Sequence, residues 1–470
     1  MMHLTPTDSL AMSWERLLSR RRYPEQPQLH VVTDAPPVRG AFVADYDRVV
    51  FSSAFRRLQR KTQVMPLPET DFVHTRLTHS LETASVGRSL GRLGGRLLLE
   101  ETDDLARTLP HLDSDFGDIV AAACLAHDIG NPPFGHSGED AVSTYFRSAA
   151  AEPFVRVLNP AQRADLQRFE GNAAGFRILT HTYAAHSSGS AGLGLTYATL
   201  GAFTKYPRPS VFEETASTHG TSEKRHGYFQ TEAARFQEVA QELGLLAKPP
   251  GAVAGFYHRH PLAFLVEAAD DICYRIIDFE DGLKLGLIPC EAGLGLMRDI
   301  LGDAPGRRGS VEWRDWREEL GYLRARLINR LVQQTARLFA DRATAFLHGR
   351  ADEPLVQHLD CWEQLQYMNS LTAEHLYQSR PVLEIETAGF EVMAGLFDAF
   401  LHAIFDPHSG PRSRKLQQLL PAQFRAVGPQ EGISAYEQII LLTDYLGGLT
   451  DQNALSLFRT IRGNNLPKVF

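Results

Sequence analysis

The sequence has little cysteine. Only four cysteines occur among 470 residues, and no two of them form a CxxC pair. They lie far apart in apolar or helical context, at Cys124, Cys273, Cys290 and Cys361. This usage is typical of reduced thiols, so we expect a cytoplasmic protein without a disulfide framework.

Long apolar runs are also missing. We find no stretch that approaches the roughly 18 apolar residues needed to cross a membrane. The first residues lack a basic segment followed by an apolar core, so no secretory signal is expected. The hydrophobic content of 43% and charged content of 22% are typical of a soluble globular protein. We therefore expect no membrane partner.

Positive charge is in deficit. Lysine and arginine number 48 against 56 acidic residues, and the formal net charge is -8. This balance opposes non-specific affinity for nucleic acid by the chain as a whole. Two local basic clusters remain, at residues 20–22 and 56–61. The second cluster, RRLQRK, fits a solvated helix face or a phosphate-facing surface about equally well.

Alternating strand patterns are scarce, whereas helical periodicity is common. Apolar residues recur at three- and four-residue spacing over 81–99, 116–125, 262–279 and 323–346. The segment VLEIET at 382–387 is too short to assign, and Val31-Val32 could at most start a small hairpin. We predict an all-α, mainly helical protein. Its expected parts are an arm over 1–40, a catalytic core over 41–290 and a C-terminal helical region over 291–470 packed on the core.

Four scattered side chains could hold one divalent metal ion. His79 lies in RLTHS, the pair His127-Asp128 ends the apolar run before GNPP, and Asp270 lies in EAADDI. A buried carboxylate without a partner is very costly, and a metal supplies that partner. His79 by itself fits a core histidine better than a ligand. Asp270 and the adjacent Asp271 cannot share one helix face, so at most one of them points at the ion.

A second candidate pair follows the PPFG turn. His136 and Glu139 are three residues apart at the expected start of a helix, which places both on one face. A carboxylate beside a histidine raises its basicity and fixes its tautomer, as general acid–base catalysis requires. The alternative is that Glu139 only interacts with the helix dipole and His136 is a loop residue.

Other residues are candidates for substrate contacts. Tyr274 and Asp278 continue the stripe of Asp270 at i+4 and i+8, so they would line the same cleft. Lysine, arginine and tyrosine near a metal suit phosphate oxygens. Each of these residues, taken singly, fits an ordinary surface position better. The remaining candidates of this kind are Arg76, Asn172, Lys205 and Tyr206.

Taken together, the chain resembles the HD-domain deoxynucleotide triphosphohydrolases, and specifically the bacterial dGTPase group. The matching segments are collinear between residues 45 and 285. They are SSAFRRLQRKTQV, TRLTHSLE, AHDIGNPPFGHSGE, FEGNAAGFR, TKYP and HPLAFLVEAADDICYRIIDFEDG. The resemblance weakens in the N-terminal arm and after residue 290. The insertion at 184–194 departs from shorter members but lies between motifs.

The resemblance implies roles residue by residue. His79, His127, Asp128 and Asp270 look like metal ligands, and the family register selects Asp270 over Asp271. His136 and Glu139 look like the catalytic pair near the α-phosphorus. The implied substrate contacts are Gln63 and Asp278 to the 3′-hydroxyl, Tyr274 against C2′, and Arg76, Asn172, Lys205 and Tyr206 on the triphosphate.

We therefore expect a dGTPase that converts dGTP and water to deoxyguanosine and triphosphate. The cofactor would be one divalent ion, Mn²⁺, Mg²⁺, Co²⁺ or Fe²⁺, because imidazole–carboxylate sites favour such metals over thiolate-selected ones. The alternatives are a broader dNTP triphosphohydrolase and a nucleotide-sensing HD protein. The resemblance implies a homo-oligomer, for which a hexamer is known in the family. A nucleotide activator and single-stranded DNA are further partners that the resemblance leaves open.

Overall fold

The computed structural model describes residues 11–24, 39–64, 74–181, 192–211, 220–248, 255–303, 313–406, 410–425 and 433–464. Over these ranges the chain is helical, and its only extended pairings are four isolated bridges. The prediction of an all-α protein is confirmed. Val31-Val32 and most of the insertion at 184–194 lie outside the described residues.

Within the described part of the first half of the chain, there are twelve α-helices and three short 3₁₀ turns. The α-helices are α1 (Trp14–Leu17), α2 (Ala41–Val50), α3 (Ser53–Arg57), α4 (Arg76–Glu101), α5 (Asp103–Thr108), α6 (Leu112–Ala126), α7 (Gly135–Arg147), α8 (Glu152–Val155), α9 (Pro160–Gln167), α10 (Gly171–Thr180), α11 (Tyr197–Phe203) and α12 (Ala233–Leu243). The 3₁₀ turns are η1 (Leu58–Arg60), η2 (Thr221–Glu223) and η3 (Gln230–Glu232).

The second half is also helical. Its α-helices are α13 (Pro261–Lys284), α14 (Cys290–Leu301), α15 (Trp316–Asp341), α16 (Ala343–Leu347), α17 (Trp362–Thr372), α18 (Arg380–Phe405), α19 (Pro411–Leu419), α20 (Ala435–Gly447) and α21 (Asp451–Ile461). Short turns are η4 (Leu355–His358), η6 (Ala422–Phe424) and the π-helical η5 (Ala373–Tyr377).

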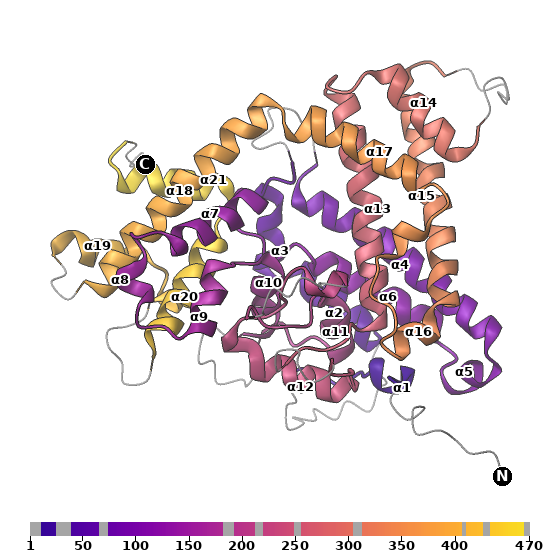
Figure 1. Ribbon diagram of the computed structural model, residues 1–470, viewed down its shortest axis with the longest axis horizontal. Helices are drawn as coiled ribbons and strands as arrows, with labels where there is room; N and C mark the ends of the chain where they lie inside the picture. The colour runs from indigo at the N-terminus through magenta and orange to yellow at the C-terminus, as the bar shows by residue number, and fades with distance from the viewer. Residues whose placement is uncertain are drawn as a thin grey trace, which may run out of the picture.

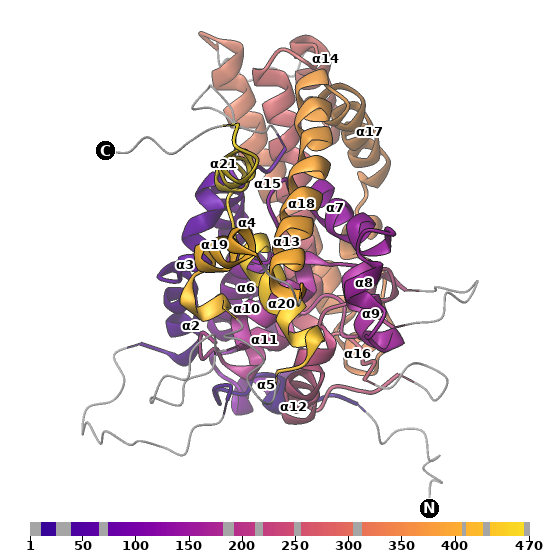
Figure 2. The same ribbon diagram turned by 90° about the vertical axis from the view of Figure 1, so that its left-hand side faces the viewer.

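The larger hydrophobic core is built around α4, α6, α13 and α15, which pack side by side (Figures 1 and 2). Local sequence explains where the long helices begin. Thr75 and Thr78 form a capping box at the start of α4, and Pro261 occupies the first turn of α13. The run from Ile119 to Ala126 in α6 is fully buried. The core therefore holds α4, α6, α13 and α15 in one fixed arrangement.

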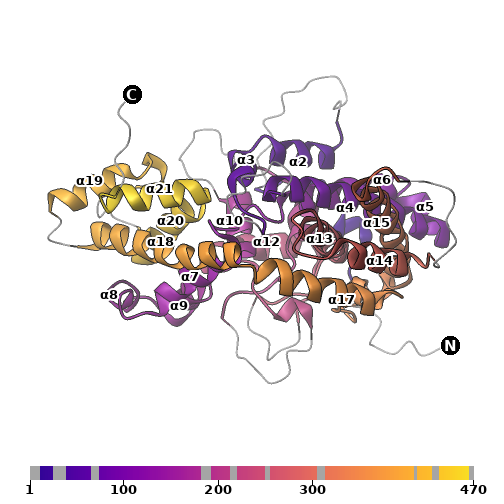
Figure 3. The same cartoon turned by 90° about the horizontal axis from the view of Figure 1, so that it is seen from above.

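A second core lies at the opposite end of the molecule from α14, α15 and α17 (Figure 3). It joins helices far apart in the sequence, because residues 141–173 pack with residues 392–454. Aromatic rings of α7 and α18 meet there, with Phe146 and Phe397 centred 5.2 Å apart. The division of the chain at residues 40 and 290 stays a prediction.

Helix α18 settles one open assignment and differs from one expectation. The unassigned segment 382–387 lies within its first two turns and is helical. Among the described helices, α18 is also long and apolar enough to cross a bilayer by length and composition. We expected no such stretch, but acidic residues interrupt this run without making it polar. Just over half of that window is buried, and Phe397 and Phe400 lie inside the second core, as in a core helix.

Close contact between α4 and α6 depends on glycine. A Cβ on Gly91 would lie 2.6 Å from the carbonyl oxygen of Phe116, and one on Gly95 would lie 2.6 Å from the Cα of Asp113. Backbone cannot yield as a flexible side chain can, so any larger residue would push the two helices apart. Since α4 and α6 carry candidate site residues, this spacing also sets the geometry of the site.

We predict that Gly91→Ala lowers the free energy of unfolding by about 1–3 kcal/mol through overpacking. Gly321→Ala in α15 is the matched control, because its added Cβ has nothing within 4 Å. That variant should gain about 0.5–1 kcal/mol from helix propensity. Denaturant unfolding followed by circular dichroism measures both. Equal stability of the two variants would contradict the account of α4–α6 contact.

Candidate active site

Four side chains converge on one point. His79 comes from α4, His127 and Asp128 from the turn directly after α6, and Asp270 from α13. His79 Nε2 lies 3.1 Å from Asp270 Oδ1, and His127 Nε2 lies 3.4 Å from the same oxygen. His127 Nε2 is 3.5 Å from Asp128 Oδ1. His79, His127 and Asp128 offer ligand atoms close enough together to hold a metal ion.

Each carboxylate of this cluster also faces a buried cation. Arg76 Nη1 donates to Asp128 Oδ2 at 2.8 Å, and Lys205 Nζ donates to Asp270 Oδ2 at 2.6 Å. Burial raises the pKa of both carboxyls, but these cations and the two imidazoles outweigh it and hold each pKa below its usual value. Both groups are therefore anionic acceptors at neutral pH.

His127 is oriented as a metal ligand requires. His127 Nδ1 lies 2.7 Å from the carbonyl oxygen of Cys124, which fixes the proton on Nδ1 and leaves the Nε2 lone pair facing the cluster. Asn131 Nδ2 donates to Asp128 Oδ1 at 2.6 Å and orients that carboxylate in turn. Two imidazoles and two carboxylates with such support fit a divalent ion of the Mn, Fe, Co or Mg type.

The neighbouring carboxylate Asp271 is used differently. It pairs with Arg275 of the same helix at 2.8 Å, whereas Asp270 faces both histidines. The structure thus brings Asp270 rather than Asp271 into the cluster.

The predicted pair His136 and Glu139 lies in the first turns of α7. His136 Nδ1 is 3.0 Å from Glu139 Oε2, and Glu139 Oε1 accepts a hydrogen bond from the Gly171 backbone at 2.9 Å. The His136 side chain is 70% exposed, so its ring can meet a ligand from solution. The hydrogen bond to Glu139 raises the pKa of His136.

A cavity of about 240 Å³ adjoins this pair. Its lining includes four predicted residues, namely Gln63, Arg76, His136 and Tyr274. Tyr377 from η5 stacks on Tyr274 with ring centroids 5.9 Å apart, and its hydroxyl donates to Asp278 Oδ2 at 2.7 Å. Burial raises the pKa of Asp278 to about 7. Asp278 thus lies directly behind the cavity wall.

Two predicted phosphate contacts, Asn172 and Tyr206, do not line the cavity. Asn172 Nδ2 donates to Glu170 Oε1 at 2.7 Å in the first turn of α10. Tyr206 follows Lys205 after α11 and is not among the side chains that line the cavity. Burial raises the pKa of the Tyr206 phenol, which keeps it a hydrogen-bond donor.

Sequence reasoning missed three residues of the site. Arg225 Nη1 lies 3.1 Å from Glu170 and 3.5 Å from Glu139. Tyr377 and Glu386 line the cavity from the C-terminal region. The basic run EKRH around Arg225 was a usable signal, whereas neither Tyr377 nor Glu386 lies in a recognisable motif.

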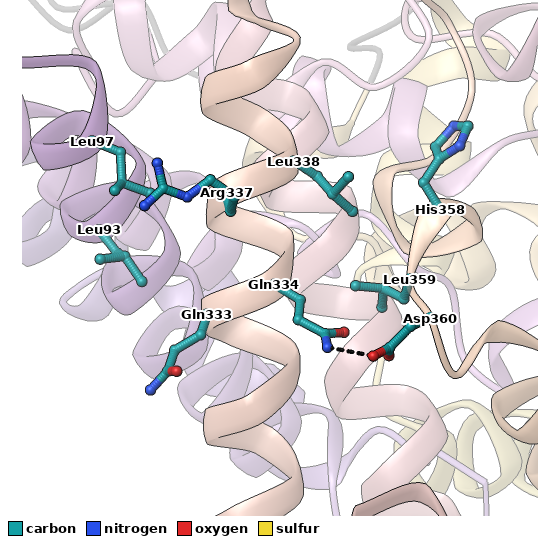
Figure 4. Close-up of a pocket in the computed structure, with 9 residues that line it drawn as sticks. All are labelled: Leu93, Leu97, Gln333, Gln334, Arg337, Leu338, His358, Leu359 and Asp360. Carbon is teal, nitrogen blue, oxygen red and sulfur yellow. Dashed lines mark hydrogen bonds between the residues drawn. The ribbon is translucent and has the colours of Figure 1, made fainter. Parts of the chain in front are cut away.

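A larger groove of about 640 Å³ lies elsewhere, between α4, α15 and η4 (Figure 4). Its titratable side chains are Arg337, His358 and Asp360, and none of the predicted site residues lines it. Asp360 is already engaged by Gln334 Nε2 at 2.9 Å. The predicted site residues are instead found at the smaller cavity, which His136 lines together with Arg76, the partner of Asp128.

Comparison with known proteins agrees with this geometry. The HD domain family matches residues 76–186, which hold His79, His127 and Asp128. A deoxyguanosinetriphosphate triphosphohydrolase-like protein of Synechocystis sp. is 42% identical over 97% of this chain and its own full length. The chain belongs to the HD-domain deoxyguanosinetriphosphate triphosphohydrolase family.

Other members of this triphosphohydrolase family align over nearly the whole chain. A like-named protein of Pseudomonas aeruginosa is 38% identical over 97% of this chain and all of its own. A deoxyguanosinetriphosphate triphosphohydrolase of Klebsiella pneumoniae is 31% identical over 94% of this chain and 97% of its own. Membership of the family and the HD domain make this chain a phosphohydrolase.

We predict that Asp270→Asn weakens binding of a divalent ion by at least about tenfold, since even outer partners of a metal site contribute about 10–100-fold. Asp271→Asn is the matched control, because its carboxylate pairs with Arg275 instead. Mn²⁺ titration followed by electron paramagnetic resonance measures both affinities. Equal affinities in the two variants would remove Asp270 from the ligand set.

Proposed function

We propose that this protein is a metal-dependent dGTP triphosphohydrolase, which converts dGTP and water to deoxyguanosine and inorganic triphosphate in the cytoplasm. One observation carries the proposal: Arg76 connects the His–Asp cluster to the cavity. It binds Asp128, and it lines the cavity together with His136. The triphosphate would then lie between the cluster and His136.

The ligands would be His79, His127, Asp128 and Asp270. A divalent ion held there supplies Lewis-acid polarisation of a phosphate oxygen and a water of lowered pKa. Around it, Arg76, Lys205 and Arg225 provide fixed positive charge for the oxygens of the triphosphate. His136, held by Glu139, is placed to give a proton to the leaving 5′-oxygen or to stabilise charge at the α-phosphorus.

The cavity supports a deoxynucleoside. Tyr274 is fixed against Tyr377, and that stacked wall would leave no room for a 2′-hydroxyl. Gln63 lines the cavity, and Asp278 lies behind its wall at Tyr377; these two would hold the 3′-hydroxyl. Glu386 is the one carboxylate among the lining residues. A carboxylate accepts two hydrogen bonds side by side, and guanine offers two adjacent donors, its N1–H and 2-amino group.

Product analysis tests this proposal. Purified protein is incubated with each dNTP and with GTP, under Mg²⁺ and then Mn²⁺, and products are separated by ion exchange. We expect deoxyguanosine and intact triphosphate from dGTP in preference to the other nucleotides. Equal turnover of all dNTPs would replace the proposal with a broad dNTP triphosphohydrolase. No turnover in any mixture, including mixtures that could supply a nucleotide activator, would favour a nucleotide sensor.

The His136–Glu139 pair predicts a pH effect. Glu139 raises the pKa of His136, so the protonated imidazole persists to higher pH than in a free histidine. If the protonated imidazole of His136 is the active form, kcat/KM should fall as pH rises through the raised pKa. In Glu139→Gln the fall should move to lower pH, toward the ordinary value of about 6.5.

The control for this profile is Asp140→Asn, an exposed neighbour on the same helix. Its pH profile should match that of the wild-type protein. A Glu139→Gln profile that keeps the wild-type inflection, or shifts to higher pH, would contradict the role of His136 as a proton donor.

A further inference from the structure

The corner between α20 and α21 lies more than 300 residues after the His–Asp motif, yet it contacts the site directly. Asp451, the first residue of α21, is 2% exposed. Its Oδ1 accepts a hydrogen bond from the Phe134 backbone at 3.0 Å. Its Oδ2 accepts two more, from the backbone of Thr62 at 2.9 Å and from the Thr62 hydroxyl. One carboxylate therefore joins two segments of the cavity wall.

The segment that contains Phe134 needs the restraint that Asp451 supplies. Phe134 has a φ of 65°, the left-handed region that a bulky residue adopts only where its surroundings impose it. It caps α7 two residues before His136, so its conformation sets the direction in which α7 begins. Its ring lies against α18, where an added Cβ on Gly389 would be 2.9 Å away. Helix α18 thus holds the ring while Asp451 holds the amide.

The second segment runs to the predicted sugar contact. Thr62 precedes Gln63, which lines the cavity. Beside it, Lys61 Nζ donates to the carbonyl oxygens of Gly447, at 2.8 Å, and of Asn131. Asn131 in turn donates to Asp128. The same corner of the fold therefore reaches the metal cluster, the catalytic pair and the sugar contact through backbone groups.

We propose that Asp451 is a positioning residue, which sets His136 and Gln63 relative to the metal cluster without touching substrate. The inference rests on the proposed function for its kinetic part. Losing three hydrogen bonds would let Phe134 leave the left-handed region and turn the first residues of α7. A misplacement of about 1 Å in a catalytic group can cost about 100-fold in rate.

The test compares Asp451→Ala with a matched control, Asp165→Ala. Asp165 is also fully buried and also accepts three hydrogen bonds, from Ser210, from Tyr436 and from the Gln230 backbone at 2.7 Å. None of those donors lines the cavity. Both variants should lose stability, so kinetics are read below the unfolding temperature of each.

We expect Asp451→Ala to lower kcat on dGTP by about 10–100-fold, while Mn²⁺ affinity stays unchanged. Hydrogen–deuterium exchange of the peptide 130–137 should speed up in this variant. In Asp165→Ala, kcat and that exchange should stay near wild type. Equal loss of kcat in the two variants, or wild-type exchange in Asp451→Ala, would overturn the proposal.

If Asp451→Ala does not fold, a milder variant, Asp451→Asn, tests the same proposal. Asp451→Asn keeps one acceptor oxygen and should show an intermediate kcat and exchange rate. Wild-type values of both in Asp451→Asn would overturn the proposal if Asp451→Ala does not fold. If the wild-type protein hydrolyses no nucleotide, the proposed function fails, and the exchange measurement still decides whether Asp451 restrains the loop.

Discussion

Two carboxylates that face two histidines, Asp128 buried and Asp270 partly buried, are the constraint on which the rest of this structure depends. Asp128 and Asp270 are anionic in surroundings where an unpaired charge is very costly. Arg76 and Lys205 each supply one positive charge from outside the cluster, at 2.8 Å and 2.6 Å. The other oxygen of each carboxylate lies 3.1–3.5 Å from an imidazole Nε2 of His79 or His127, and these atoms offer the lone pairs that a divalent ion would accept.

The spacing between helices brings these side chains together. The three ligand-bearing helices come from residues 76–284, and glycines at the α4–α6 contact allow their backbones to approach closely. Lys205 enters from the end of α11. The second core then brings α18, α20 and α21 against the loop that precedes α7. The site therefore lies where the two cores meet, which explains why C-terminal side chains line a cavity whose acid–base and metal chemistry lies in the N-terminal half.

Local patterns in the sequence predicted the parts of the site that depend on local geometry. The period over 81–99 lies inside α4, and the i, i+3 spacing of His136 and Glu139 places their polar atoms 3.0 Å apart. Contacts between residues far apart in the sequence have no local pattern from which they could be predicted. Tyr377 reaches Asp278 across 99 positions and Asp451 reaches Phe134 across 317. Segment 382–387 looked ambiguous because its apolar alternation also fits one turn of a half-buried helix.

The central claim is that this cluster directs water to the α-phosphorus, and oxygen-isotope tracing tests it most directly. Hydrolysis of dGTP is run in ¹⁸O-labelled water, and both products are analysed by mass spectrometry. The account predicts one labelled oxygen in the triphosphate and none in deoxyguanosine, because the P–O5′ bond breaks. Label in the 5′-hydroxyl, or stepwise release of labelled monophosphate, would contradict it.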